Sequence, residues 1–162
     1  NARRSCEGRA NKPQKPNENF FRLLPESVTK IHAMSDKLKY FSPSEFTMDG
    51  QPVFHKMNPA FLQLLDKCRE LAGVPFVITS SYRSPSKNRR VGGSVGSMHL
   101  YGRAVDIECP DGATRWKIVK AAMSLGLSVG VMRSALHLDN REGIPTMFDY
   151  YPRYGEGVSA DE

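Results

Sequence analysis

Residues 97–106 have the sequence SMHLYGRAVD, which joins a polar loop to a predicted buried strand. His99 lies at the end of the loop, and Asp106 lies inside an otherwise apolar strand that begins at Ala104. Gly102 gives the backbone between them the freedom to turn back, so that both side chains can meet at one point. A lone buried carboxylate is costly, and a cation beside Asp106 would offset that cost. The stretch therefore predicts one half of a metal site.

A second polar pair, His137 and Asp139, lies in another predicted strand. Residues two positions apart point to the same face of a strand, so these two side chains are neighbours. With His99 and Asp106, His137 completes a set of two imidazoles and one carboxylate, which leaves a tetrahedral zinc ion one open position. Such an ion lowers the pKa of its bound water to about 7 and polarises a peptide carbonyl. The set is therefore of the kind found in catalytic rather than structural zinc sites.

The same side chains also have simpler explanations. A single histidine such as His99 or His137 is more often a hydrogen-bonded surface or core residue than a metal ligand. Asp106 could instead form an ion pair with Arg103 or Arg83, which would also compensate a buried carboxylate. Spacing alone leaves both the metal site and the ion pair open.

The elements around these residues alternate between helices and strands in mixed order. A helix is predicted over residues 58–72, because Asn58 and Pro59 are typical of a helix start and Gly73 of a helix end. Its predicted apolar stripe is Phe61, Leu64, Leu65, Cys68 and Leu71. The other predicted elements are a short helix from Ser42, strands near 76–79, 104–109, 127–132 and 135–139, a helix over 114–125, and a surface loop over 81–98. The mixed order and short links favour an α+β fold with a small, mostly antiparallel sheet flanked by helices.

Composition sets further limits on this chain. Its 162 residues, 40% hydrophobic and 25% charged, are enough for one globular domain with a core. Lys and Arg total 23 against 17 Asp and Glu, a net charge of +6 that favours polyanions, which include nucleic acid, anionic lipid and bacterial envelope polymers. No apolar run approaches the ~20 residues of a membrane helix, and no secretory signal is visible at the start. The three cysteines include no C-x-x-C pair, so a thiolate zinc site is not expected.

The chain divides into three predicted segments. Residues 1–19 are basic and proline-containing, and we expect a flexible arm. Residues 20–145 form the domain that holds the candidate metal ligands. Residues 146–162 form an aromatic tail, which we expect to pack back on the domain. The glycine-rich run 92–96 opens no helix, so a phosphate-binding loop is not expected. Nucleic acid is not the expected partner either, although the basic arm leaves a nucleic-acid or virion-assembly module as a rival.

Residues 97–106 resemble the S-x-H-x-x-G-x-A-x-D signature of the D-alanyl-D-alanine carboxypeptidase family of zinc peptidases, peptidase family M15. The resemblance extends from about residue 39 to residue 141 and includes three further motifs in the same order. These motifs are FSPSEF at 41–46, ITSSYRSP at 78–85 and HLDNR at 137–141, the last resembling a closing H-x-D-x-R. Members of the family cut peptidoglycan stem peptides as carboxypeptidases or as phage endolysin endopeptidases.

The resemblance implies a fold of the hedgehog and DD-peptidase type and a role for each matching residue. It makes His99, Asp106 and His137 the ligands of one Zn²⁺ per chain. It makes Arg83 the arginine that faces the substrate, and a guanidinium fork suits a carboxylate or a developing oxyanion. Ser97 would either support the site through a hydrogen bond or cap a turn.

The chain departs from the family pattern at the general base. Many relatives have a catalytic glutamate three residues before the last histidine ligand, where this chain has Ser134. The branch with H-x-D offers Asp139 instead, and we take it as the candidate base. Asp139 could equally orient a ligand histidine. Glu108 and Asp111 are the remaining candidates.

The resemblance therefore predicts a zinc-dependent peptidase that hydrolyses an amide bond in peptidoglycan stem or cross-link peptides, as a D,D-carboxypeptidase or an endopeptidase. It would act at the bacterial cell wall or periplasm, with a phage or virion origin left open. The alternative is a zinc-bearing binding or virion-assembly module without turnover. The hedgehog signalling domain, whose GRAVDI run matches residues 102–107, shows that zinc ligands on this scaffold need not mean catalysis. The sequence leaves the oligomeric state open.

Overall fold

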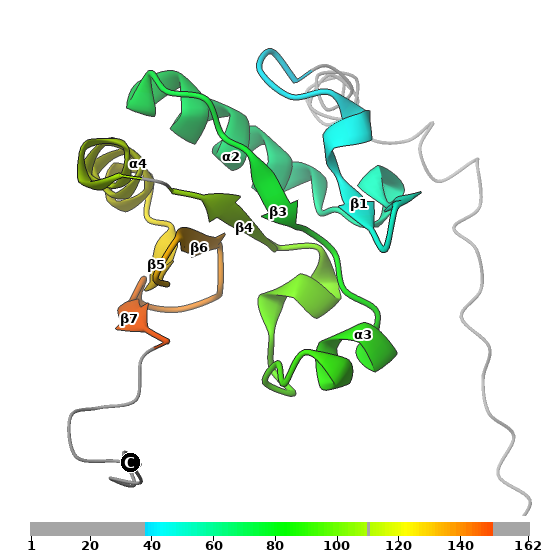
Figure 1. The fold of residues 1–162 in the computed structure, drawn as a ribbon. Coiled ribbons are helices and arrows are strands. Elements are labelled where there is room, and N and C mark those ends of the chain that lie inside the picture. Colours follow the sequence, from blue (N-terminus) through cyan, green and yellow to red (C-terminus); the bar gives the residue numbers. More distant parts are fainter. Residues whose placement is uncertain (1–37, 110, 151–162) are drawn as a thin grey trace, which may run out of the picture. The chain divides into compact units, whose positions relative to one another are not determined.

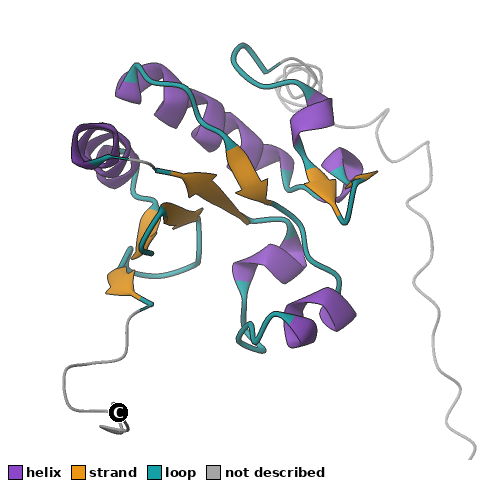
Figure 2. Cartoon of the chain, viewed as in Figure 1, coloured by secondary structure: helices purple, strands orange, loops and turns teal. Residues whose placement is uncertain are grey.

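A five-stranded sheet in the order β3-β4-β6-β5-β7 lies at the centre of the fold (Figure 1). The computed structural model describes residues 38–109 and 111–150, so the predicted arm over 1–19 and most of the aromatic tail lie outside the described residues. The strands are β3 (Ile78–Ser80), β4 (Ala104–Glu108), β5 (Ser128–Val131), β6 (Ala135–Asp139) and β7 (Met147–Asp149). All neighbouring pairs are antiparallel except β5 and β7, which are parallel. The predicted α+β fold with a mostly antiparallel sheet is confirmed (Figure 2).

Three α-helices and three short 3₁₀ helices accompany the sheet in the part of the chain that the structure describes. They are α2 (Pro59–Ala72), α3 (Pro85–Arg90), α4 (Gly112–Ser124), η3 (Pro43–Glu45), η4 (Phe54–Lys56) and η5 (Met98–Tyr101). A small hairpin of β1 (Thr47–Met48) and β2 (Gln51–Pro52) follows η3. None of the described helices has both the length and the apolar character needed to cross a membrane.

Helix α2 forms where the sequence predicts it. The Asn58 side chain accepts a hydrogen bond from the Phe61 backbone N–H at 3.0 Å, and Gly73 ends the helix in the left-handed conformation with φ of 63°. The predicted stripe is partly wrong, because the buried face consists of Phe61, Leu62, Leu65, Cys68 and Ala72. Leu71 is 52% exposed, since its position on the helix lies beside the core-facing row rather than in it.

The two faces of the sheet differ in polarity. Along β4 and β6, Val105, Ile107, Leu136 and Leu138 are completely buried and belong to the apolar core. That core also contains residues of α2 and α4, which contact each other. Because successive strand residues point to opposite faces, the residues between them project to the other side of the sheet. The alternation therefore places Asp106, His137 and Asp139 together on the face away from the apolar core.

The segment over 81–98 is not the simple loop that the sequence predicts. Ser84 accepts a hydrogen bond from the Lys87 backbone N–H at 3.2 Å, Pro85 occupies the first turn, and α3 follows. The predicted helix from Ser42 is a single 3₁₀ turn with a complete capping box between Ser42 and Glu45. Both helices begin with a serine cap followed by proline, at Ser42 and at Ser84. The first extends over three residues and the second over six.

Candidate metal centre

Three buried ligand atoms meet on the polar face of the sheet. His99 Nε2 lies 3.1 Å from Asp106 Oδ1 and 3.1 Å from His137 Nδ1, and His137 Nδ1 lies 2.9 Å from Asp106 Oδ1. His99 is 1% exposed, Asp106 6% and His137 4%. A tetrahedral zinc ion with bonds of about 2.0–2.2 Å separates its ligand atoms by roughly 3.3 Å. The triangle therefore has nearly the size that such an ion requires, and these three residues could hold a metal.

Strand pairing and one tight turn bring these residues together. Asp106 and His137 are direct partners across the antiparallel β4–β6 ladder, so their side chains emerge side by side. His99 comes from η5, which ends at Gly102 with φ of 64°. The Gly102 carbonyl accepts a hydrogen bond from the Asn58 backbone N–H at 2.9 Å, which ties this turn to the start of α2. Gly102 thus adopts the left-handed conformation just before the chain enters β4, as the predicted turn requires.

The second nitrogen of each histidine is held by the protein. His99 Nδ1 lies 2.6 Å from the Ser81 carbonyl oxygen, and His137 Nε2 lies 2.9 Å from Asp139 Oδ2. A carbonyl or an ionised carboxylate can only accept, so these two nitrogens carry the protons. His99 Nε2 and His137 Nδ1 are therefore left unprotonated and directed at the same point, which is the state a metal ligand needs.

Asp106 has a partner on each of its oxygens. Oδ1 faces the two histidines, and Oδ2 accepts a hydrogen bond from the Arg83 guanidinium. Burial acts to raise the pKa of Asp106, but hydrogen bonds that His137 and His99 can donate to Oδ1 in their doubly protonated forms outweigh it and hold that pKa below its usual range. The side chain is thus an anion at neutral pH. The ion pair with Arg83 exists alongside the metal-ligand geometry, while Arg103 contacts Asn140 and Glu142 instead.

Asp139 lies behind His137 and does not line the pocket. It is completely buried, and its oxygens accept hydrogen bonds from His137 Nε2 and from the backbone and side chain of Arg141. Burial acts to raise the pKa of Asp139, but the bonds from His137 and Arg141 keep it below its usual range. The geometry thus favours the second of the two roles that the sequence leaves open, the orientation of a histidine.

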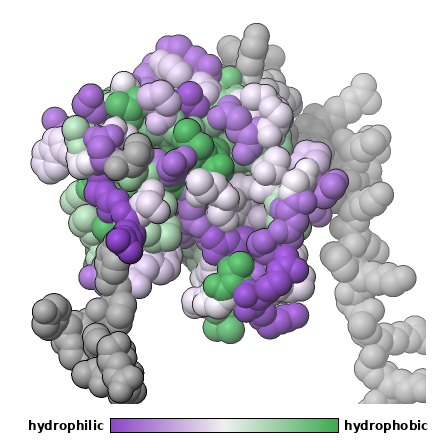
Figure 3. Space-filling model, viewed as in Figure 1, coloured by the Kyte–Doolittle hydropathy of each residue, from purple (hydrophilic) through white to green (hydrophobic). Residues whose placement is uncertain are grey.

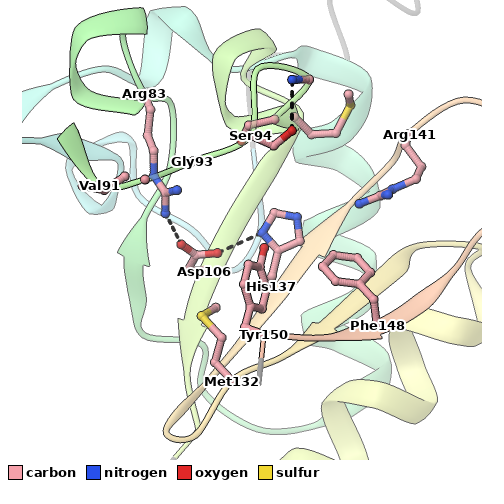
Figure 4. A pocket seen from close by; sticks show the side chains of 14 residues that line it. Arg83, Val91, Gly93, Ser94, Asp106, Met132, His137, Arg141, Phe148 and Tyr150 are labelled. Atoms are coloured by element: carbon pink, nitrogen blue, oxygen red, sulfur yellow. Dashed lines mark hydrogen bonds and ion pairs between the residues drawn. The ribbon is translucent and has the colours of Figure 1, made fainter. Parts of the chain in front are cut away.

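A cavity of about 470 Å³ is lined by two of the three candidate ligands, Asp106 and His137 (Figure 4). Asp106 is the single carboxylate among its described lining residues, which include Gly92, Gly93, Ser94 and Gly96 of the glycine-rich run. Further lining side chains are those of Arg83, Met132, Arg141, Phe148 and Tyr150. Figure 3 shows hydrophilic and weakly polar residues over most of the visible face, with hydrophobic residues in small groups. The pocket is therefore a mixed polar and apolar site whose lining includes the Asp106 carboxylate and the His137 imidazole.

The remaining sequence candidates lie around this site or away from it. Arg83 lines the pocket, and its Nε donates a hydrogen bond to Ser80 Oγ at 2.9 Å. Ser97 also lines the pocket and precedes η5 without a side-chain capping bond. Glu108 is exposed at the end of β4, and Asp111 caps α4 by accepting a hydrogen bond from the Thr114 backbone N–H at 2.8 Å. Neither acid is among the pocket residues.

Sequence reasoning did not identify Phe148 and Tyr150 as site residues. Their rings lie 5.8 Å and 6.2 Å from the His137 ring, between centroids. Burial and the negative charge of Asp106 raise the pKa of Tyr150. The available signal was the two-residue spacing of these aromatics, which places them on one face of an extended segment.

A comparison with protein-family models agrees with the motifs. A sequence model of the peptidase M15 family matches residues 39–139. No curated protein sequence matches the chain. Among solved structures, the chain is similar to the L-Ala D-Glu endopeptidase ChiX of Serratia marcescens, with 22% sequence identity and a TM-score of 0.39 over 54% of this chain and 82% of that one. Because the family match spans more than half of its length, the chain belongs to the peptidase M15 family.

Proposed function

We propose that this protein is a zinc-dependent peptidase that hydrolyses an amide bond in bacterial peptidoglycan peptides, at the cell wall. The observation that carries the proposal is the triangle of His99 Nε2, Asp106 Oδ1 and His137 Nδ1, two of whose residues, Asp106 and His137, line an open pocket. Three protein ligands leave a position for water or substrate, which is the arrangement of catalytic zinc sites. Membership of a peptidase family supports amide hydrolysis, and the resemblance to cell-wall peptidases supports the substrate class.

A zinc ion at this site would supply Lewis acidity and a water of lowered pKa. The protein's own residues orient the ligands and the substrate. Asp139 keeps the proton of His137 on Nε2, and the Ser81 carbonyl does the same for Nδ1 of His99. Arg83 holds the outer oxygen of Asp106 and also lines the pocket, where its guanidinium suits a substrate carboxylate or a developing oxyanion.

Digestion of purified peptidoglycan tests this function. We expect the zinc-loaded protein to release peptide fragments that mass spectrometry assigns to one bond type, and a chelator to abolish their release until zinc is restored. The assigned bond distinguishes a carboxypeptidase, which removes a terminal residue, from an endopeptidase. Zinc-loaded protein that leaves the peptidoglycan intact would contradict the proposal.

A binding module without turnover is the second candidate. It is favoured by one observation, namely that the described pocket residues include no carboxylate besides the ligand Asp106. A module of this kind would bind peptidoglycan fragments and zinc without cutting them. The same digestion experiment separates the two candidates, because it measures products rather than binding.

Arg83→Lys is expected to lower turnover by about 10- to 100-fold while the zinc content stays at about one per chain. Lysine keeps the charge but cannot donate to Ser80 and Asp106 from one planar fork and still face the substrate. The magnitude corresponds to one hydrogen bond to a charged group, about 1.5–3 kcal/mol. Steady-state kinetics and metal analysis check it, with Arg90→Lys on the exposed side of α3 as the matched control. Unchanged turnover would remove Arg83 from the mechanism.

Asp139→Asn is expected to weaken zinc binding by about 10- to 100-fold, the usual effect of losing the partner that orients a ligand histidine. Turnover should then recover when zinc is added in excess. A general base would behave differently, because its loss lowers the rate by about 10²–10⁴ at every zinc concentration. A titration of rate against added zinc distinguishes the two roles. Asp66→Asn, which affects a carboxylate on α2, is the control.

A further inference from the structure

The C-terminal strand β7 supplies one wall of the pocket. Parallel pairing holds it against β5, with hydrogen bonds from Val129 N–H to the Thr146 carbonyl at 2.9 Å and from Tyr150 N–H to the Val131 carbonyl at 3.1 Å. Phe148 and Tyr150 are two residues apart, and their rings lie 5.5 Å apart between centroids. The backbone therefore directs both aromatic side chains to the His137 side of the sheet.

Gly130 makes this packing feasible. In the sheet it is paired with His137 on one side and with Phe148 on the other. A Cβ atom at Gly130 would lie 2.8 Å from a ring carbon of Phe148 and 2.8 Å from a ring carbon of Tyr150. Such separations are shorter than van der Waals contact allows. The absence of a side chain at this position is what lets the two rings close over the strand beside His137.

Tyr150 places a neutral hydroxyl at the metal-ligand end of the pocket. Figure 4 shows its side chain running alongside the His137 imidazole, whereas Ser94 lies in the more distant rim. Tyr150 interacts electrostatically with Asp106 and Arg83, and within the described residues no hydrogen bond engages its hydroxyl. The Arg83 and Arg141 guanidinium groups are already bonded to Asp106 and Asp139. A phenol has an ordinary pKa of about 10 and remains a donor at neutral pH.

We propose that Tyr150 donates a hydrogen bond to the carbonyl oxygen of the scissile amide as that oxygen gains negative charge. This inference rests on the proposed peptidase function. The phenol keeps its proton throughout, so the step is electrostatic stabilisation without proton transfer. The aromatic ring forms an apolar part of the pocket wall, and the hydroxyl is its hydrogen-bond donor. Among the described lining residues, Asp106 is the only carboxylate.

Tyr150→Phe tests the hydroxyl alone, because the ring is retained. We expect kcat to fall on the order of 10²-fold, as when one oxyanion donor is removed, with KM and zinc content unchanged. A phosphinate analogue of the scissile amide, which carries charge where the oxyanion forms, should bind more weakly by a similar factor in calorimetry. Binding of the cleaved peptide product, which lacks the oxyanion, should not change. Tyr40→Phe, whose hydroxyl contacts Glu70 on α2, is the matched control and should equal wild type.

Two results would overturn the inference, and they are distinguishable. If wild-type protein cleaves peptidoglycan and Tyr150→Phe matches it in kcat and in phosphinate affinity, Tyr150 only packs against His137 and the proposed function stands. If zinc-loaded wild-type protein shows no cleavage, the proposed function fails, and the role of Tyr150 fails with it.

Discussion

His137→Ala is expected to remove most of the zinc from the purified protein and to lower turnover by about 10³-fold or more. His137 contributes Nδ1 to the ligand triangle, and two remaining ligands do not form the three-residue set of a catalytic zinc site. The loss of rate follows because the metal contributes several kcal/mol of transition-state stabilisation, and each 1.36 kcal/mol is a factor of about ten. Metal analysis and peptidoglycan digestion measure the two effects independently.

The control for this change is His55→Ala. His55 is exposed in η4 and lies outside the pocket, so its loss should leave zinc content and turnover unaltered. His99→Ala and Asp106→Ala should behave like His137→Ala, since each removes one corner of the same triangle. Full zinc occupancy in all three of these variants would show that the metal binds elsewhere.

Gly102→Ala is expected to lower the free energy of unfolding by about 2–5 kcal/mol. The left-handed backbone, with φ of 64°, costs a non-glycine residue about 1–2 kcal/mol. A Cβ atom would also lie 2.8 Å from Met57 Cα and still closer to the Lys56 carbonyl oxygen, and overpacking of this kind costs about 1–3 kcal/mol. Both atoms belong to the backbone, so the neighbouring chain has little freedom to move away.

Gly73→Ala separates the two contributions to this loss. Gly73 has nearly the same φ of 63° at the end of α2, but no heavy atom lies within 4 Å of its ideal Cβ position. The change should therefore cost only the conformational part, about 1–2 kcal/mol. Urea unfolding of both variants provides the comparison. Equal losses at the two positions would mean that the close approach of Gly102 to Lys56 and Met57 has no energetic consequence.

The fold class and several elements were predictable because their signals are local. The capping residues of α2 lie within a few positions of the backbone groups they satisfy, and alternation along β4 and β6 separates core-facing from polar residues. Family motifs then identified His99, Asp106 and His137 as a candidate ligand set. The structure brings these three residues together, as a metal site requires. Their identity as zinc ligands remains to be tested by the variants above.

Helix α3 and strand β7 were missed for different reasons. The residues of α3 are polar and basic without an apolar stripe, so no periodicity indicated a helix beyond the Ser84–Pro85 start signal. Strand β7 has only three residues, and it exists because β5 offers it an edge. Its residues form no apolar run like the one at 76–79, from which the strand near β3 was predicted.

The sequence by itself determined which chemical groups this protein can place around a metal, because those groups are specific residues at specific spacings. Tertiary structure alone decided where each group lies and what it contacts. Strand register sets Asp106 beside His137, and hydrogen bonds assign the free nitrogen of each imidazole. The same packing turns Asp139 toward Arg141 and away from the pocket, and brings Tyr150 to His137 from the far end of the described chain. These outcomes depend on contacts between segments that are distant in the sequence. Local sequence does not show which distant atom will bond to each imidazole nitrogen or carboxylate oxygen.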